Sequence, residues 1–86
     1  MKANLLVYPN PFKDEAIIQF YLVNESKVSL ELYNLTGQKI RAVLDDAYLE
    51  KGIQHFSLNR NNLPNGAYIC MLRTNNSVET QKIIIQ

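Results

Sequence analysis

Apolar side chains recur at every second position along most of this chain, and that period limits the fold more than any other feature. In AIIQFYL, residues 16–22, every even-numbered position is apolar, and VSLELY, residues 28–33, repeats the pattern. Successive side chains of a strand point to opposite faces, so this period predicts strands with one face turned to a core. An amphipathic helix would instead space its apolar residues three and four apart.

Seven short segments carry this pattern or are apolar throughout. They are 5–8, 16–22, 28–33, 40–44, 54–58, 67–73 and 78–85. Turn-forming residues separate them, and DDAYLEKG, residues 45–52, is expected to be a longer connection. Seven strands in 86 residues predict an all-β fold, a seven-stranded antiparallel β-sandwich of immunoglobulin or fibronectin type III kind.

The inward phase of each strand predicts the core. The segment AYICMLR, residues 67–73, is apolar on both faces, which is typical of a central strand covered on both sides. The phase of the last strand stays open, because residues 83–85 are all isoleucine. The predicted core residues are Ile18, Phe20, Leu30, Leu32, Ile40, Phe56, Leu58, Tyr68 and Leu72.

The stretch VYPNPF places Asn10 between Pro9 and Pro11, just ahead of the second strand. Proline cannot donate a backbone hydrogen bond, and it biases the residue before it toward extended backbone. The stretch therefore predicts a stiff bend that ends a short first strand and directs the next.

Three glycines are expected to lie in turns, and a tyrosine close to the last of these glycines is expected to have a structural role. Gly37 can adopt the positive φ that a hairpin often requires, and Gly52 and Gly66 close later connections. Tyr68 precedes Cys70 by two residues, as in the tyrosine corner of immunoglobulin domains. We expect its hydroxyl to bond the turn before Gly66.

Charge and composition exclude several classes of function. Nine basic and eight acidic side chains give a net charge of +1, without a basic run or an acidic tail. That balance argues against a nucleic-acid partner and against an electrostatic membrane anchor. One cysteine and one histidine cannot build a disulfide or a zinc site of these residue types.

No group of side chains points to catalysis. His55 is out of phase with the apolar positions of its strand and should face solvent, while Cys70 should be a small buried apolar residue. The acid pairs 14–15 and 45–46 lack the spacing of a calcium loop. We expect no enzyme activity, catalytic residue, metal, cofactor or small-molecule substrate. Five tyrosines leave a carbohydrate-binding face open as an alternative.

Four segments in a fixed order resemble a known family. They are YPNPF at 8–12, VSLELYNLTGQKI at 28–40, LPNGAY at 63–68 and TQKIII at 80–85. Together they are similar to the C-terminal sorting domain (type A) of proteins exported by the type IX secretion system, the Por secretion system tail, and the likeness covers residues 7–86. On this resemblance residues 1–86 are one sorting domain, a piece of a longer protein, with residues 1–6 as a strand or linker remnant.

The resemblance implies a secretion and sorting signal. The expected partners are an N-terminal passenger domain, the type IX outer-membrane translocon and a sortase-like signal protease that cuts upstream of the domain. The expected route runs through the periplasm to the outer-membrane surface or the extracellular space.

The resemblance also places recognition toward the end of the sequence, at Lys82, Ile83, Ile84 and Ile85. An exposed edge of this last strand would offer unpaired backbone groups to a receptor. The alternative function is a structural or carbohydrate-binding immunoglobulin-like accessory module of an extracellular enzyme. Position separates the two expectations, since a sorting signal should end its chain, and the pattern runs to within a residue of Gln86.

Overall fold

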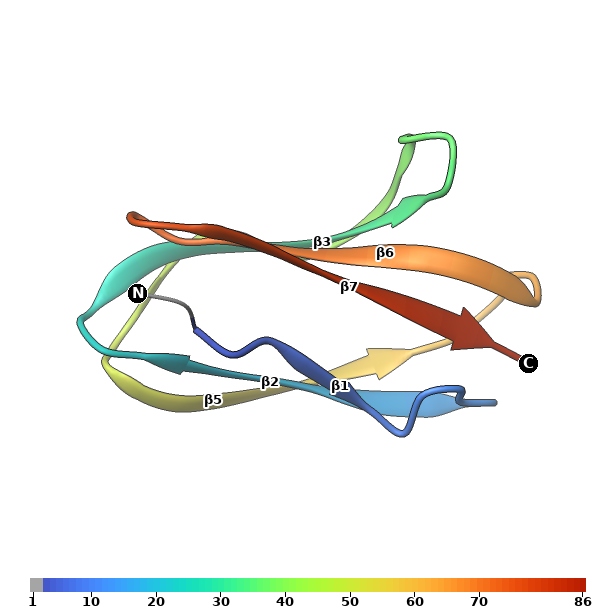
Figure 1. Ribbon diagram of the computed structural model, residues 1–86, viewed down its shortest axis with the longest axis horizontal. Helices are drawn as coiled ribbons and strands as arrows, with labels where there is room; N and C mark the ends of the chain where they lie inside the picture. The colour runs from blue at the N-terminus through green and yellow to red at the C-terminus, as the bar shows by residue number, and fades with distance from the viewer. Residues whose placement is uncertain (1–2) are drawn as a thin grey trace.

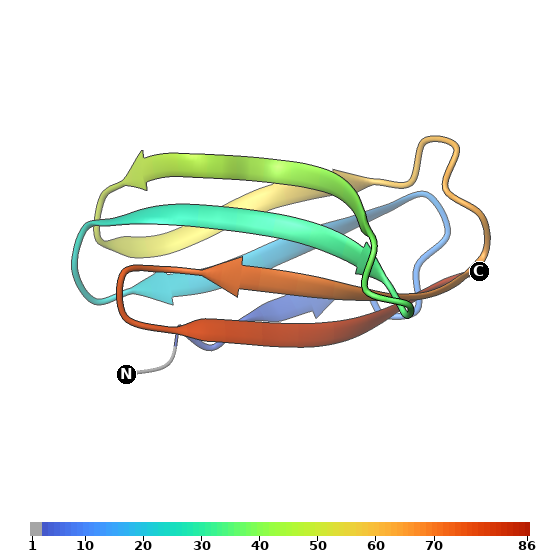
Figure 2. The same ribbon diagram turned by 90° about the horizontal axis from the view of Figure 1, so that it is seen from above.

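Two antiparallel sheets pack face to face in this computed structural model, which describes residues 3–86 (Figures 1 and 2). One sheet has the strand order β1-β2-β5 and the other β4-β3-β6-β7. The strands are β1 (Leu6–Tyr8), β2 (Glu15–Leu22), β3 (Ser26–Asn34), β4 (Lys39–Leu49), β5 (Gly52–Asn59), β6 (Gly66–Arg73) and β7 (Val78–Ile85).

This architecture confirms the predicted all-β sandwich. Residues 3–86 contain no helix, and hence none that is long and apolar enough to cross a membrane. Of the expected strand or linker remnant at residues 1–6, residues 1 and 2 lie outside the described part, and Leu6 begins β1.

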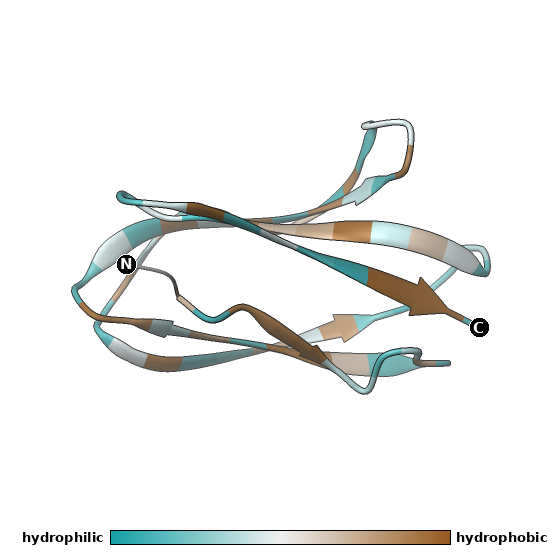
Figure 3. Cartoon of the chain, in the orientation of Figure 1, coloured by the Kyte–Doolittle hydropathy of each residue, from teal (hydrophilic) through white to brown (hydrophobic). Residues whose placement is uncertain are grey.

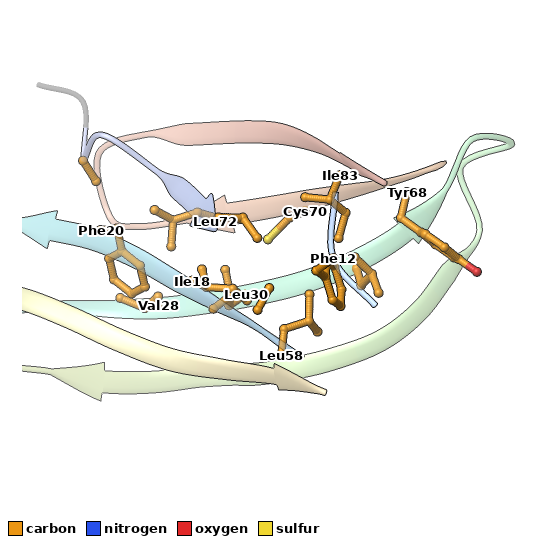
Figure 4. Packing of buried hydrophobic residues seen from close by; sticks show 14 of the residues in the cluster. Phe12, Ile18, Phe20, Val28, Leu30, Leu58, Tyr68, Cys70, Leu72 and Ile83 are labelled. Atoms are coloured by element: carbon orange, nitrogen blue, oxygen red, sulfur yellow. The ribbon is translucent and has the colours of Figure 1, made fainter. Parts of the chain in front are cut away.

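The core lies between the sheets and takes buried side chains from every strand except β4 (Figure 4). The Phe20 ring, 1% exposed, stacks on Phe56 with the ring centres 6.0 Å apart. Phe56 itself is only partly buried. The other predicted core residues that are buried are Ile18, Leu30, Leu32, Leu58, Tyr68 and Leu72.

Strand β4 differs from the prediction in two ways. Ile40, expected in the core, is 37% exposed, because β4 is an edge strand that begins in a hairpin rising away from the sheet (Figure 1). The expected connection at 45–52 is mostly strand, since β4 continues to Leu49. A β-bulge makes this possible: Asp45 and Asp46 together oppose Ser29, whose hydroxyl accepts the Asp46 N–H at 3.0 Å.

Strand β6 lies inside the four-stranded sheet, but only one of its faces is covered. Cys70 and Leu72 on its inner face are buried, whereas Ala67, Ile69 and Met71 on its outer face are half-buried. The expected cover on both sides is therefore wrong. Apart from the hairpin between β3 and β4, which stands over the start of β6 (Figures 1 and 2), no further layer lies over these outer side chains among residues 3–86.

Candidate functional site

Asn10 acts as a short piece of strand against the outer edge of β7. Its side-chain Nδ2 donates to the Lys82 carbonyl oxygen at 2.9 Å, and its Oδ1 accepts the Ile84 N–H at 2.9 Å. A carboxamide carries the same donor and acceptor as a peptide group, so it pairs with a strand edge as backbone would. Pro9 and Pro11 flank it, and the peptide bond before each proline is cis.

Phe12 continues this pairing along β7. Its N–H donates to the Ile84 carbonyl oxygen at 3.0 Å, and its carbonyl oxygen accepts the Gln86 N–H at 3.0 Å. The result is a parallel bridge between Phe12 and Ile85. We call the hydrogen bonds from residues 10–12 to residues 82–86 the entrance clamp. It joins the two outermost sequence segments that carry the family resemblance.

The four expected recognition residues separate into two pairs. Ile83 and Ile85 are 0% and 1% exposed and belong to the core, whereas Lys82 is exposed and Ile84 is half-buried. Figure 3 shows this strand changing from hydrophilic at its centre to hydrophobic at its end. Of these four residues, Lys82 and Ile84 present their side chains on the outer face of the sheet.

The expected unpaired edge of the last strand is wrong for its final third. Backbone groups of even-numbered residues point outward from β7, and the entrance clamp occupies them at Ile84 and Gln86 and at the Lys82 carbonyl. Within residues 3–86, no hydrogen bond reaches the Lys82 N–H or the outward groups of Thr80. The edge that remains available is therefore the middle of β7.

The Arg60 side chain links the end of β7 to Lys13, which directly follows the clamp residues 10–12. Its Nη1 donates to the carbonyl oxygens of Lys13 and Gln86, each at 3.2 Å, and its Nε donates to that of Leu63 at 3.0 Å. Its Nη2 bonds the Asn65 side chain. The five donors of a guanidinium suit this task, because one side chain can tie several carbonyls. Sequence reasoning missed Arg60.

Turn residues keep the surrounding loops in place. The Tyr68 hydroxyl donates to the Pro64 carbonyl oxygen at 2.6 Å, just before Gly66. Asn34 Oδ1 accepts the N–H groups of Thr36 and Gln38 at 3.1 and 2.9 Å, and Gly37 supplies the turn's φ of +89°. Gly52 and Gly66 also have positive φ, at +120° and +154°.

Groups that could perform chemistry are isolated. Burial raises the pKa of the Cys70 thiol to about 12, so the reactive thiolate is scarce at neutral pH. His55 is exposed and its Nε2 lies 3.0 Å from Gln19 Oε1. Residues 3–86 contain no group of three or more His, Cys, Asp or Glu side chains that could hold a metal ion.

One acid is buried on the outer face of the four-stranded sheet. The Glu31 carboxylate, 5% exposed, lies 3.1 Å from Lys39 Nζ and 3.2 Å from Arg73 Nη1. The Tyr33 hydroxyl donates to it at 3.0 Å. Burial acts to raise the Glu31 pKa, but the bonds from Lys39 and Tyr33 and the charges of Arg73 and Lys39 together lower it. Glu31 thus fixes two cations on this surface.

Replacing Asn10 with alanine should lower the free energy of unfolding by about 1–2 kcal/mol, because two hydrogen bonds are lost and the exposed edge rehydrates. Hydrogen exchange at the Ile84 amide should accelerate by a larger factor than exchange at core amides. Asn76→Ala, at an exposed turn position whose side chain makes no hydrogen bond among residues 3–86, is the matched control. Equal effects at Asn10 and Asn76 would show that the clamp contributes no stability.

The Glu31 cluster should make a contribution to the free energy of unfolding that depends on pH. Its carboxyl pKa lies below the ordinary 4.5 in the folded chain, so the folded state binds protons less readily than the unfolded state. The contribution is complete above about pH 4.5 and disappears as the pH falls below it. The stability difference between the parent and Glu31→Gln, from urea denaturation, should be large at pH 7 and small at pH 3. A difference that does not change with pH contradicts this account.

Residues 6–86 match the protein family described as "Secretion system C-terminal sorting domain". No curated protein matches the chain. Among solved structures, the crystal structure of the Ig1 domain of mouse SynCAM 2 is similar, with 21% identity and a TM-score of 0.51, over 95% of this chain and 92% of that one. At this identity the likeness bears on the fold alone, and it agrees with the predicted immunoglobulin-like sandwich.

Proposed function

Because the chain belongs to the family of secretion system C-terminal sorting domains, we propose that it docks on the type IX outer-membrane translocon and carries an N-terminal passenger domain with it. The domain is a type IX sorting signal, and a protein that carries it reaches the outer-membrane surface or the extracellular space. The observation that carries the assignment is the family match over residues 6–86. We expect no catalytic activity from the domain itself.

The proposed route runs through the periplasm, where the domain folds, and a sortase-like protease then cuts upstream. The packing of the first described residues supports a cut ahead of Ala3. Ala3 and Val7 are 4% and 3% exposed, and the Ala3 carbonyl accepts the Tyr21 N–H at 2.8 Å. A protease needs several residues of extended, accessible chain, and this segment is folded into the sandwich.

Within the recognition segment we propose different roles for the two pairs. Lys82 and Ile84 contact the export machinery directly, since their side chains lie on the outer face of the sheet. Ile83 and Ile85 act through the fold, because they are core residues.

A reporter fusion tests the proposal. A periplasmic reporter fused ahead of residues 1–86 should appear outside cells of a strain with a type IX translocon and stay inside an isogenic strain without it. The control is the same reporter ahead of an unrelated immunoglobulin-like domain. Equal release with and without the translocon would refute the proposed function.

A further inference from the structure

The hairpin between β3 and β4 stands over the outer face of the four-stranded sheet. Figures 1 and 2 place it above the start of β6 and toward the end of β7. Asn34 Oδ1 orders it by accepting three hydrogen bonds from Thr36 and Gln38. The hairpin is therefore built before any partner arrives, and binding would cost little conformational entropy there.

This ordered hairpin holds an apolar side chain in solvent beside a hollow. Leu35, at its tip, is 61% exposed and lines a hollow of about 310 Å³ together with Tyr33, Ile69 and Met71. The hollow is open to solvent rather than enclosed, so a side chain of another molecule can reach it from outside. An ordered loop that exposes leucine next to an apolar hollow marks an interaction surface more than a single exposed residue does.

The recognition segment continues this surface. Strand register places Tyr33 opposite Ile69 and Ile69 opposite Lys82, so the three lie in one row across β3, β6 and β7. Ile84, opposite Ala67, is the next outward residue of β7. Two segments that lie far apart in the sequence, the hairpin and the end of β7, thus share one face.

The charge of this face is positive. Lys39 and Arg73 keep half of their side chains exposed, at 51% and 49%, whereas the Glu31 carboxylate that pairs with both is 5% exposed. Lys82 adds a further exposed cation at the β7 edge of the row. Asp45, an exposed acid near Lys39, offsets part of this charge and leaves the three cations in excess over the two acids. A partner that covers this face should therefore carry acidic groups.

We propose that this face, the hollow with Leu35 and its border of Lys39, Arg73 and Lys82, docks a protein partner of the export machinery. The partner inserts an apolar side chain into the hollow and places carboxylates along the three cations. A protein fits better than an anionic membrane surface, because a planar array of headgroups cannot fill a hollow under a projecting hairpin. The inference rests on the proposed function and specifies the surface that carries it out.

The reporter assay tests the surface with single variants. Leu35→Thr removes the apolar contact beside the hollow, and Lys82→Glu reverses a charge on its border, so each should lower the exported fraction at least about fivefold. Ile53→Thr is the matched control, because Ile53 is also 61% exposed but lies on the other sheet. All three variants should melt within about 4 °C of the parent, since surface substitutions have small effects.

The outcomes separate the inference from the proposed function. If the parent is not exported, the proposed function fails. If the parent is exported and both Leu35→Thr and Lys82→Glu are exported at the parental level, the docking surface is wrong and the proposed function stands. An equal loss in Ile53→Thr also overturns the surface. Should Leu35→Thr melt lower than expected, Lys82→Glu alone decides.

A binding measurement identifies the class of partner. The purified domain should bind outer-membrane vesicles that contain the translocon, with binding that weakens between 50 and 300 mM salt, roughly the range over which surface charges become screened. Protease digestion of the vesicles, or the Leu35→Thr substitution, should remove the binding. Undiminished binding to digested vesicles or to vesicles of lipopolysaccharide would overturn the protein partner.

Discussion

Replacing Phe20 with alanine should lower the free energy of unfolding by about 3–5 kcal/mol, the largest effect expected of any single substitution considered. Phe20 is 1% exposed between the two sheets, so the substitution leaves a cavity that the sheets cannot close. A domain of this size has a total stability of about 4–13 kcal/mol. A loss of about 3–5 kcal/mol is therefore a large fraction of the total stability of the domain.

Phe56→Ala is the control for this prediction. Its ring stacks on Phe20 but is only partly buried. The loss should be about 2 kcal/mol, because less apolar surface returns to water. Urea denaturation at constant slope measures both values. Losses below about 1 kcal/mol at Phe20, or equal losses at both positions, would contradict the assigned packing.

Ile83→Ala should cost about 2–4 kcal/mol of stability and reduce export through the fold. Ile83 is fully buried against the core, and its neighbour Lys82 is exposed. We therefore expect different results for the two variants. Ile83→Ala should lower both the melting temperature and the exported fraction, whereas Lys82→Glu should lower the exported fraction alone. Measuring both quantities for both variants provides the test.

Temperature gives a further check on the Ile83 variant. If export fails because the domain unfolds, it should recover in cells grown well below the variant's melting temperature. Export that stays low in a domain shown to be folded would mean that a partner reads Ile83 directly, and the division of roles between buried and exposed residues would be wrong.

The β-sandwich could be predicted from the sequence, because apolar residues at every second position indicate which face of each strand is turned toward the core. Residues such as Ile18 and Leu30 needed no more than that. The prediction that Ile40 is buried was wrong, because its strand lies at an edge of the sheet and begins in a projecting hairpin. The alternation of apolar and polar residues indicates neither of these features. The prediction of a connection at residues 45–52 was wrong, because a β-bulge at Asp45 and Asp46 allows these turn-forming residues to remain in β4.

The contacts of the candidate site were harder to predict, because they join distant segments through unremarkable residues. The two prolines predicted the bend. The sequence did not indicate that Asn10 pairs with Lys82 and Ile84, which lie 72 and 74 residues away. Arg60 lies in a segment rich in turn-forming residues, where an arginine is ordinarily expected to be a solvated surface residue. Its fork of bonds to Lys13 and Gln86 depends on loops that only the folded topology brings together.

The entrance clamp has a mechanical consequence. Phe12 runs parallel to Ile85, so tension between the two ends of the described chain pulls these segments past each other along their length. Their hydrogen bonds are then loaded in shear and must break together, which resists force better than unzipping one bond at a time. Resistance of this kind is a matter of unfolding rate rather than equilibrium stability. A domain that tows a passenger would hold its shape under drag even with a modest free energy of unfolding.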